Sequence, residues 1–70
     1  MTNEFRVTVN GEQRSFEAGT TLLGVVRALE LAPERVAVEY NRAIVKRELW
    51  DTTELEPDAA IEIVMFVGGG

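Results

Sequence analysis

The residues best placed to do chemistry are three consecutive glycines, Gly68, Gly69 and Gly70, which follow the apolar run "IVMFV" at the end of the sequence. A carboxylate on Gly70 would have the least hindered carbonyl of any residue, and the glycines before it let the backbone enter a channel too narrow for side chains. At about 3.4 Å per residue, the last four residues reach roughly 14 Å. The tail therefore suits a substrate of another protein's active site better than a catalyst.

The rest of the composition leaves little chemistry for the chain itself. The sequence has no cysteine and no histidine, which removes the thiolate nucleophile and the commonest general base and metal ligand. A glycine-rich phosphate loop needs a helix after it. Hydrolysis by a pair of carboxylates needs a cleft that removes one of them from water. A chain of 70 residues has too little apolar surface to build such a cleft. We expect no enzyme activity, no bound cofactor and no metal.

Length and charge narrow the class of partner. Seventy residues with 46% hydrophobic content predict a single domain. Twelve acidic and seven basic residues give a net charge of −5, which disfavours nucleic acid and anionic membranes and favours a partner with a basic docking face. The start "MTNEFRVTV" resembles no signal peptide, and no apolar run is long enough to span a membrane. We expect a cytoplasmic protein.

The first half of the sequence reads as a hairpin followed by a helix. Alternation in "FRVTVN" predicts a strand with one buried face, and Asn10-Gly11 predicts a type I′ turn into a second strand, "EQRSFEA", with Phe16 facing inward. Thr20 or Thr21 can cap a helix through "TLLGVVRALEL", whose apolar residues recur at helical spacing. We expect Pro33 to end this helix.

Three more strands follow. "VAVEY" predicts the third, and Asn41 marks the turn after it. "AIVKRELW" predicts a short fourth strand that tightens into a single turn near Trp50, a residue expected in the core rather than at an interface. After "DTTELEPD" comes the last strand, "AIEIVMFV".

This order of elements predicts an α+β fold, the ubiquitin-like β-grasp, in which one helix covers one face of a mixed four- to five-stranded sheet. The last strand must be central or nearly so, because Ile61, Ile63 and Met65 form an apolar stripe that needs the helix above it. Residues 1–67 would form the domain and residues 68–70 a flexible tail. The expected core contains Phe5, Val7, Leu22, Val26, Leu29, Val38, Ile61 and Ile63.

Docking residues follow from the alternation of the last strand. If Ile61 and Ile63 face the helix, then Glu62, Val64 and Phe66 face the other side of the sheet. Val64 and Phe66 form an apolar patch at the base of the tail that a partner could bury, unless a loop or a flattened sheet edge covers them. A further acidic group, expected near the tail, either steers a basic partner or is merely solvated; it comprises Glu54, Glu56, Asp58 and Glu62.

Over nearly its whole length the sequence resembles the ThiS family, the sulfur carriers of thiazole formation in thiamine biosynthesis. The resemblance rests on "VTVNGE", on "YNRAIVKRELW", on Leu55, and above all on "IEIVMFVGGG" with its final Gly-Gly. Two features depart from the family pattern: Lys46 stands where proline is usual, and "EPDAA" replaces an Asp-Gly-Asp turn.

The resemblance implies that a ThiF-like, E1-like adenylyltransferase uses ATP to adenylate the Gly70 carboxylate, and that a sulfur donor system converts it to a thiocarboxylate. The thiocarboxylate would then supply sulfur to a ThiG-like thiazole synthase. Three alternatives stay open: the small subunit of molybdopterin synthase or a carrier for tRNA thiolation, a protein modifier joined to lysines, and an interaction module with an inert tail. Lys46 is the only lysine, so chains of such a modifier would have one branch point.

Overall fold

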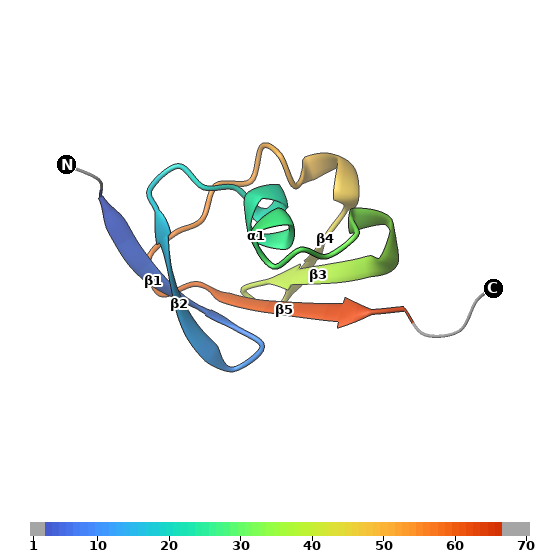
Figure 1. Ribbon diagram of the computed structural model, residues 1–70, viewed down its shortest axis with the longest axis horizontal. Coiled ribbons are helices and arrows are strands. Elements are labelled where there is room, and N and C mark those ends of the chain that lie inside the picture. The colour runs from blue at the N-terminus through green and yellow to red at the C-terminus, as the bar shows by residue number, and fades with distance from the viewer. Residues whose placement is uncertain (1–2, 67–70) are drawn as a thin grey trace.

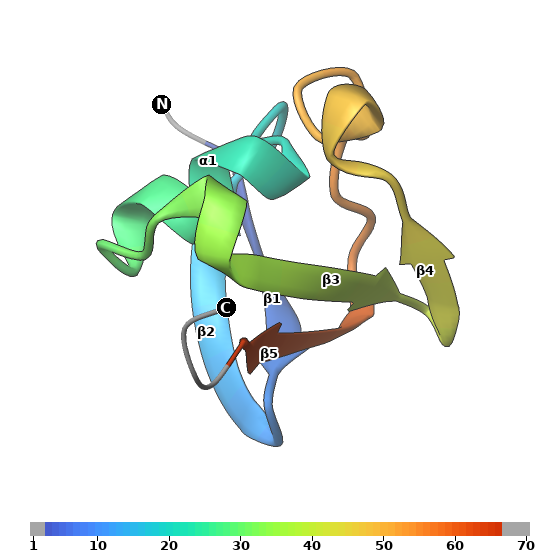
Figure 2. The same ribbon diagram turned by 90° about the vertical axis from the view of Figure 1, so that its right-hand side faces the viewer.

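The chain folds as a five-stranded mixed sheet with one α-helix across one face (Figure 1, Figure 2). The computed structural model describes residues 3–66. Its strands are β1 (Glu4–Val9), β2 (Glu12–Glu17), β3 (Val36–Tyr40), β4 (Ala43–Val45) and β5 (Ala60–Met65), and its helix is α1 (Leu22–Ala28). Two 3-10 helices, η1 (Pro33–Arg35) and η2 (Arg47–Leu49), precede β3 and follow β4. The order β2-β1-β5-β3-β4 places β5 at the centre, which confirms the β-grasp prediction.

Both hairpins turn through left-handed backbone conformations. Asn10 and Gly11, between β1 and β2, have φ values of 51° and 83°. Asn41 and Arg42, between β3 and β4, have φ values of 51° and 72°. Positive φ at both central residues is what a type I′ turn requires, so both turn predictions are confirmed.

Helix α1 begins as expected but ends earlier. The Thr21 hydroxyl accepts a hydrogen bond from the Gly24 N–H at 3.2 Å, which confirms Thr21 as the N-cap. The prediction that Pro33 ends the helix is wrong, because α1 ends at Ala28 and Pro33 instead begins η1.

The early end of α1 has a physical cause in the residues just after it. Glu30 adopts a φ of 59°, and its N–H donates to the Arg27 carbonyl at 2.9 Å. The Leu31 N–H donates to the Val26 carbonyl at 3.1 Å. These two bonds form a Schellman motif, which satisfies the last carbonyls of the helix and turns the chain away from the helix axis.

The core lies between α1 and the sheet. Of the eight expected core residues, Phe5 and Leu29 are only partly buried and pack against its edge, whereas the other six are buried. Trp50 is also buried, and its Nε1–H donates to the Val45 carbonyl at 2.8 Å, which confirms the expectation that it belongs to the core. Phe16 packs partly buried against the same cluster.

The apolar stripe of β5 is shorter than expected. Ile61 and Ile63 are buried, but Met65 is 56% exposed, so its assignment to the helix-covered stripe is wrong. Met65 pairs with Val36, the first residue of β3. At that end β5 extends past α1 (Figure 1), and the helix no longer covers the residues on its side of the sheet.

Candidate functional site

The site begins where β5 ends. Gly68, Gly69 and Gly70, the residues predicted to react, lie outside the described residues, as does the predicted boundary between domain and tail. The strand that leads to them is paired on one side as far as Phe66, whose N–H donates to the Arg35 carbonyl at 2.8 Å. This bond holds the backbone of Phe66 to the residue just before β3.

Two asparagine side chains also hold the backbone of β5. Asn10 Nδ2 donates to the Ile63 carbonyl at 3.1 Å, and Asn10 Oδ1 accepts from the Ile63 N–H at 2.7 Å. On the other side, Asn41 Oδ1 accepts from the Ala60 N–H at 2.9 Å. Asn10 thereby continues the pairing of β5 beyond the last residue of β1, Val9, which stands opposite Ile61. The sequence pattern predicts both asparagines only as turn residues. Their hydrogen bonds to β5 could not be predicted, because the sequence does not show which strand lies beside each turn.

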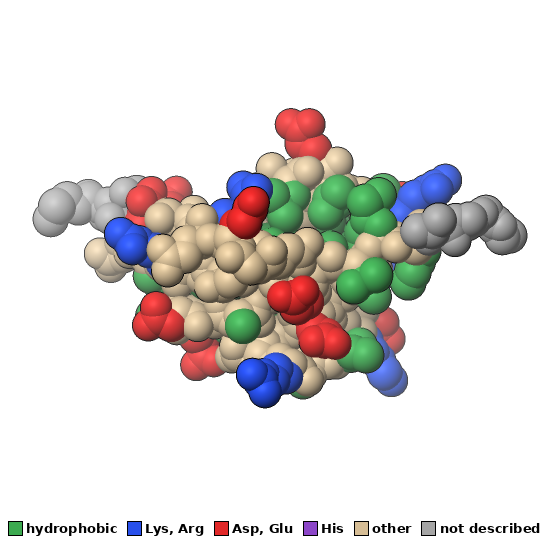
Figure 3. Space-filling view, turned by 90° about the horizontal axis from the view of Figure 1, so that it is seen from below, with side chains coloured by type: hydrophobic (Ala, Val, Ile, Leu, Met, Phe, Trp, Pro, Cys, Tyr) green, Lys and Arg blue, Asp and Glu red, His purple; other side chains and the backbone are tan. Residues whose placement is uncertain are grey.

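Two of the three predicted docking residues, Glu62 and Val64, lie on the open face of the sheet, and Phe66 follows one residue beyond β5. Glu62, Val64 and Phe66 are exposed, with Val64 at 60% and Phe66 at 57%. Within residues 3–66 no loop buries them, so the alternative in which a loop covers them is wrong for the part of the chain that the structure describes. Seen from the side opposite α1, hydrophobic side chains gather on one half of this face, with acidic side chains beside them (Figure 3).

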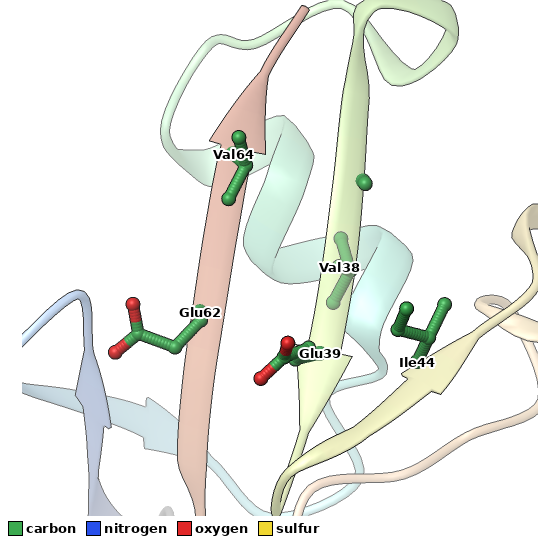
Figure 4. Close-up of a pocket in the computed structure, with 6 residues that line it drawn as sticks. Val38, Glu39, Ile44, Glu62 and Val64 are labelled. Carbon is green, nitrogen blue, oxygen red and sulfur yellow. The ribbon is translucent and has the colours of Figure 1, made fainter.

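A groove crosses this open face over β3, β4 and β5 (Figure 4). Its volume is about 250 Å³, and its lining residues are Ala37, Val38, Glu39, Ile44, Glu62 and Val64. Glu39 stands directly opposite Glu62 on β5 and opposite Ile44 on β4, which makes one row across three strands. In another row Ala37 stands opposite Val64. The small side chain of Ala37 leaves the hollow between these rows.

The β3 and β4 residues of this groove are not among the predicted docking residues. Ala37 and Glu39 alternate with the buried Val36 and Val38 in "VAVEY", which would have placed them on the open face. The pairing of Glu39 with Glu62 depends on the register between β3 and β5, and no local pattern gives that register.

Most of the predicted acidic group lies away from the last described residue, Phe66. Glu54, Glu56 and Asp58 belong to the segment that leads into Ala60, the first residue of β5, at the opposite end of the strand from Phe66 (Figure 1). The Asp58 N–H donates to the Arg6 carbonyl at 2.7 Å, which holds this segment against β1. Of the four residues, only Glu62 belongs to the open face beside the patch.

Tyr40 ties the segment before β5 to β3. Its hydroxyl accepts a hydrogen bond from the Glu56 N–H at 2.8 Å. Partial burial raises the pKa of the Tyr40 phenol above its ordinary value of 10.0, and the Glu56 carboxylate acts in the same direction, whereas the hydrogen bond lowers it. The phenol therefore stays neutral at physiological pH and serves as a structural contact.

Among residues 3–66, acidic side chains do not cluster in a group of three or more that could hold a metal ion. None of the helices in the described part of the chain has the length and apolar character needed to cross a membrane.

The model of the ThiS family matches residues 7–70, a range that includes the three terminal glycines. In structure the chain resembles the crystal structure of the thiamine biosynthesis protein ThiS from Geobacter metallireducens, with a TM-score of 0.77 and 32% identity. That likeness covers 94% of this chain and 100% of the other.

Two longer relatives also match. The thiazole synthase of Magnetococcus marinus is 48% identical over 65 residues, and that of Paramagnetospirillum magneticum is 34% identical over 65 residues. Each match covers 93% of this chain but only 20% of the relative. The chain therefore spans about one fifth of the length of these two proteins.

Proposed function

The chain belongs to the ThiS family, and from this premise we propose that it is a sulfur carrier for thiazole formation in thiamine biosynthesis. Its Gly70 carboxylate is adenylated and then converted to a thiocarboxylate. The observation that carries this proposal is that the family match continues through Gly70. The chain acts as a co-substrate of partner enzymes and binds no cofactor of its own.

The chemistry explains why the carrier needs so few reactive groups. A carboxylate resists nucleophilic attack until it carries a good leaving group. One oxygen of the Gly70 carboxylate attacks the α-phosphorus of ATP on a ThiF-like adenylyltransferase, pyrophosphate leaves, and an acyl-adenylate forms. Sulfide delivered by a donor system then attacks the acyl carbon, the bond to AMP breaks, and AMP leaves, which gives a thiocarboxylate. All positioning of ATP belongs to the partner, which suits a chain without cysteine or histidine.

A ThiG-like thiazole synthase is the acceptor that the relatives favour. In Magnetococcus marinus and Paramagnetospirillum magneticum, a segment similar to this chain is part of a protein named thiazole synthase. A carrier segment and a synthase that share one chain are expected to work on the same sulfur. This favours thiazole formation over molybdopterin synthesis, tRNA thiolation or protein modification.

The fold supplies what such a carrier requires. β5 is held on both sides by neighbouring strands and by Asn10 and Asn41. The open face presents Val64 and Phe66 beside the point where the strand ends. A partner can therefore bind the rigid domain through this patch, while Gly68, Gly69 and Gly70 enter its active site.

The test is the intact mass of the chain after incubation with a ThiF-like adenylyltransferase, ATP and sulfide. We expect the mass to rise by one oxygen-to-sulfur exchange, located at Gly70 by fragmentation, and to stay unchanged without ATP. The matched control is the same chain with a carboxamide in place of the Gly70 carboxylate, which keeps the shape of the tail and should not react. Absence of conversion of the carboxylate form, or equal conversion of both forms, would contradict the proposal.

A further inference from the structure

The groove on the open face is lined by two glutamates, and Figure 4 shows the carboxylate of Glu62 turned away from that of Glu39. Glu39 and Glu62 are directly opposite across the β3–β5 pair, and both are exposed. Within residues 3–66 the ion pair that forms is Arg14 with Glu12, at 3.8 Å, and it involves neither of them. Like charges directly opposite each other destabilise an antiparallel pair, so a cation placed between them would remove a repulsion as well as gain two attractions.

The walls of the groove fit the stem of a long basic side chain. Ile44 is 75% exposed and Val64 is 60% exposed, and both line the groove beside the two glutamates (Figure 4). Arginine and lysine pack their methylene stems along apolar surface and keep the charged group at a polar site. The volume of about 250 Å³ is far too small for a protein segment but large enough for one such side chain.

We propose that this groove receives an arginine or lysine of the enzyme that adenylates Gly70, with its stem against Ile44 and Val64 and its charged group between Glu39 and Glu62. The inference rests on the proposed function, because it names the docking contact of the same partner. ATP and a carboxylate both carry negative charge, and basic side chains are the groups that commonly bind them. The groove lies on the strand that feeds the tail into that site, so its two negative charges complement the entrance.

The experiment measures the steady-state rate of Gly70 conversion against carrier concentration, with the adenylyltransferase that converts the wild-type chain. Its test variant is Glu39→Gln with Glu62→Gln. The matched control is Glu54→Gln with Glu56→Gln. Like the test variant, it changes the net charge of the chain from −5 to −3, but at exposed positions in the segment before β5. A second test variant, Ala37→Ile, fills the hollow and leaves both glutamates in place.

We expect the Glu39 and Glu62 variant to raise KM roughly 10- to 100-fold, the loss typical of hydrogen bonds to a charged group. The value of kcat should stay near that of wild type, because the tail is intact. Ala37→Ile should also raise KM, and the control pair should change it less than about threefold, as expected for exposed charges away from an interface. Increasing salt should raise KM for wild type more than for the test variant.

The outcomes separate this inference from the proposed function. If wild type converts and the test and control pairs raise KM equally, net charge alone steers the encounter and the groove contact is wrong, while the carrier function stands. If the glutamate variant changes transfer to a thiazole synthase but not adenylation, the groove belongs to that partner and the inference is equally wrong. If wild type is not converted at all, the proposed function and this inference both fail.

Discussion

The two faces of β5 differ in what covers them. Ile61 and Ile63 face α1 and are 0% and 7% exposed, whereas Val64 on the other side is 60% exposed and Phe66, one residue beyond the strand, is 57% exposed. All four side chains are apolar, and they come from six consecutive residues of one chain segment. A small domain gains stability only from the face that its single helix covers. The difference indicates that the inner residues maintain the fold, and under the proposed function the outer residues are available to a partner.

The largest expected effect breaks the inner face. Ile61→Ala removes a fully buried side chain, and we expect a loss of about 2–5 kcal/mol in the free energy of unfolding. The matched control on the outer face, Val64→Ala, should change it by less than about 0.5 kcal/mol. Denaturant unfolding of both variants measures the difference. Similar losses in the two would mean that the faces are not separated as described.

An intermediate effect is expected at the side chain that ties β5 to the first hairpin. Asn10→Ala removes both hydrogen bonds to Ile63 and places alanine at a φ of 51°, so we expect a loss of about 1–3 kcal/mol. Asn10→Gly is the control, because glycine tolerates this φ and loses only the two bonds. Amide hydrogen exchange at Ile63 should accelerate in both variants. If Asn10→Gly is as stable as wild type, the side chain does not hold the strand.

A smaller effect on stability, but a clear one on binding, is expected on the outer face. Phe66→Ala should weaken affinity for the adenylating enzyme by about tenfold or more, because exposed aromatic side chains commonly dominate binding energy. Its free energy of unfolding should fall by less than about 1 kcal/mol, since Phe66 is 57% exposed. Calorimetric titration and thermal unfolding measure the two quantities. A large loss of stability with unchanged affinity would place Phe66 in the core.

Most of the fold could be predicted because its signals are local. Alternation predicts the buried residues of β1 and β5 except at Met65, where α1 no longer covers the sheet, and Asn10-Gly11 predicts the first turn. The end of α1 could not be predicted in this way, because glutamate at position 30 gives no sign that it adopts a positive φ. Asp58 does the same at a φ of 65°, just before β5, in the turn where the family pattern has Asp-Gly-Asp.

The candidate site could be predicted only in part. The outward parity of Glu62 and Val64 follows from β5 alone, and both are exposed between buried Ile61 and Ile63, whereas Phe66 lies one residue beyond the strand. The contribution of Glu39 and Ile44 depends on how β3 and β4 pair with their neighbours, which is a property of the folded sheet. The mistaken position of the acidic residues before β5 has the same origin: closeness in sequence to the tail is not closeness in space.

The central claim is that stability belongs to the domain while the chemistry belongs to the tail, and Gly69→Val tests it most directly. Valine adds a branched side chain one residue before the reacting carboxylate, where a narrow channel should exclude it. We predict that conversion of Gly70 by the adenylating enzyme, followed by intact mass, falls roughly 10- to 100-fold, with a smaller fall for Gly69→Ala. Thermal unfolding should match that of wild type. Conversion of Gly69→Val at the wild-type rate would contradict the claim that the tail must thread through a partner's active site.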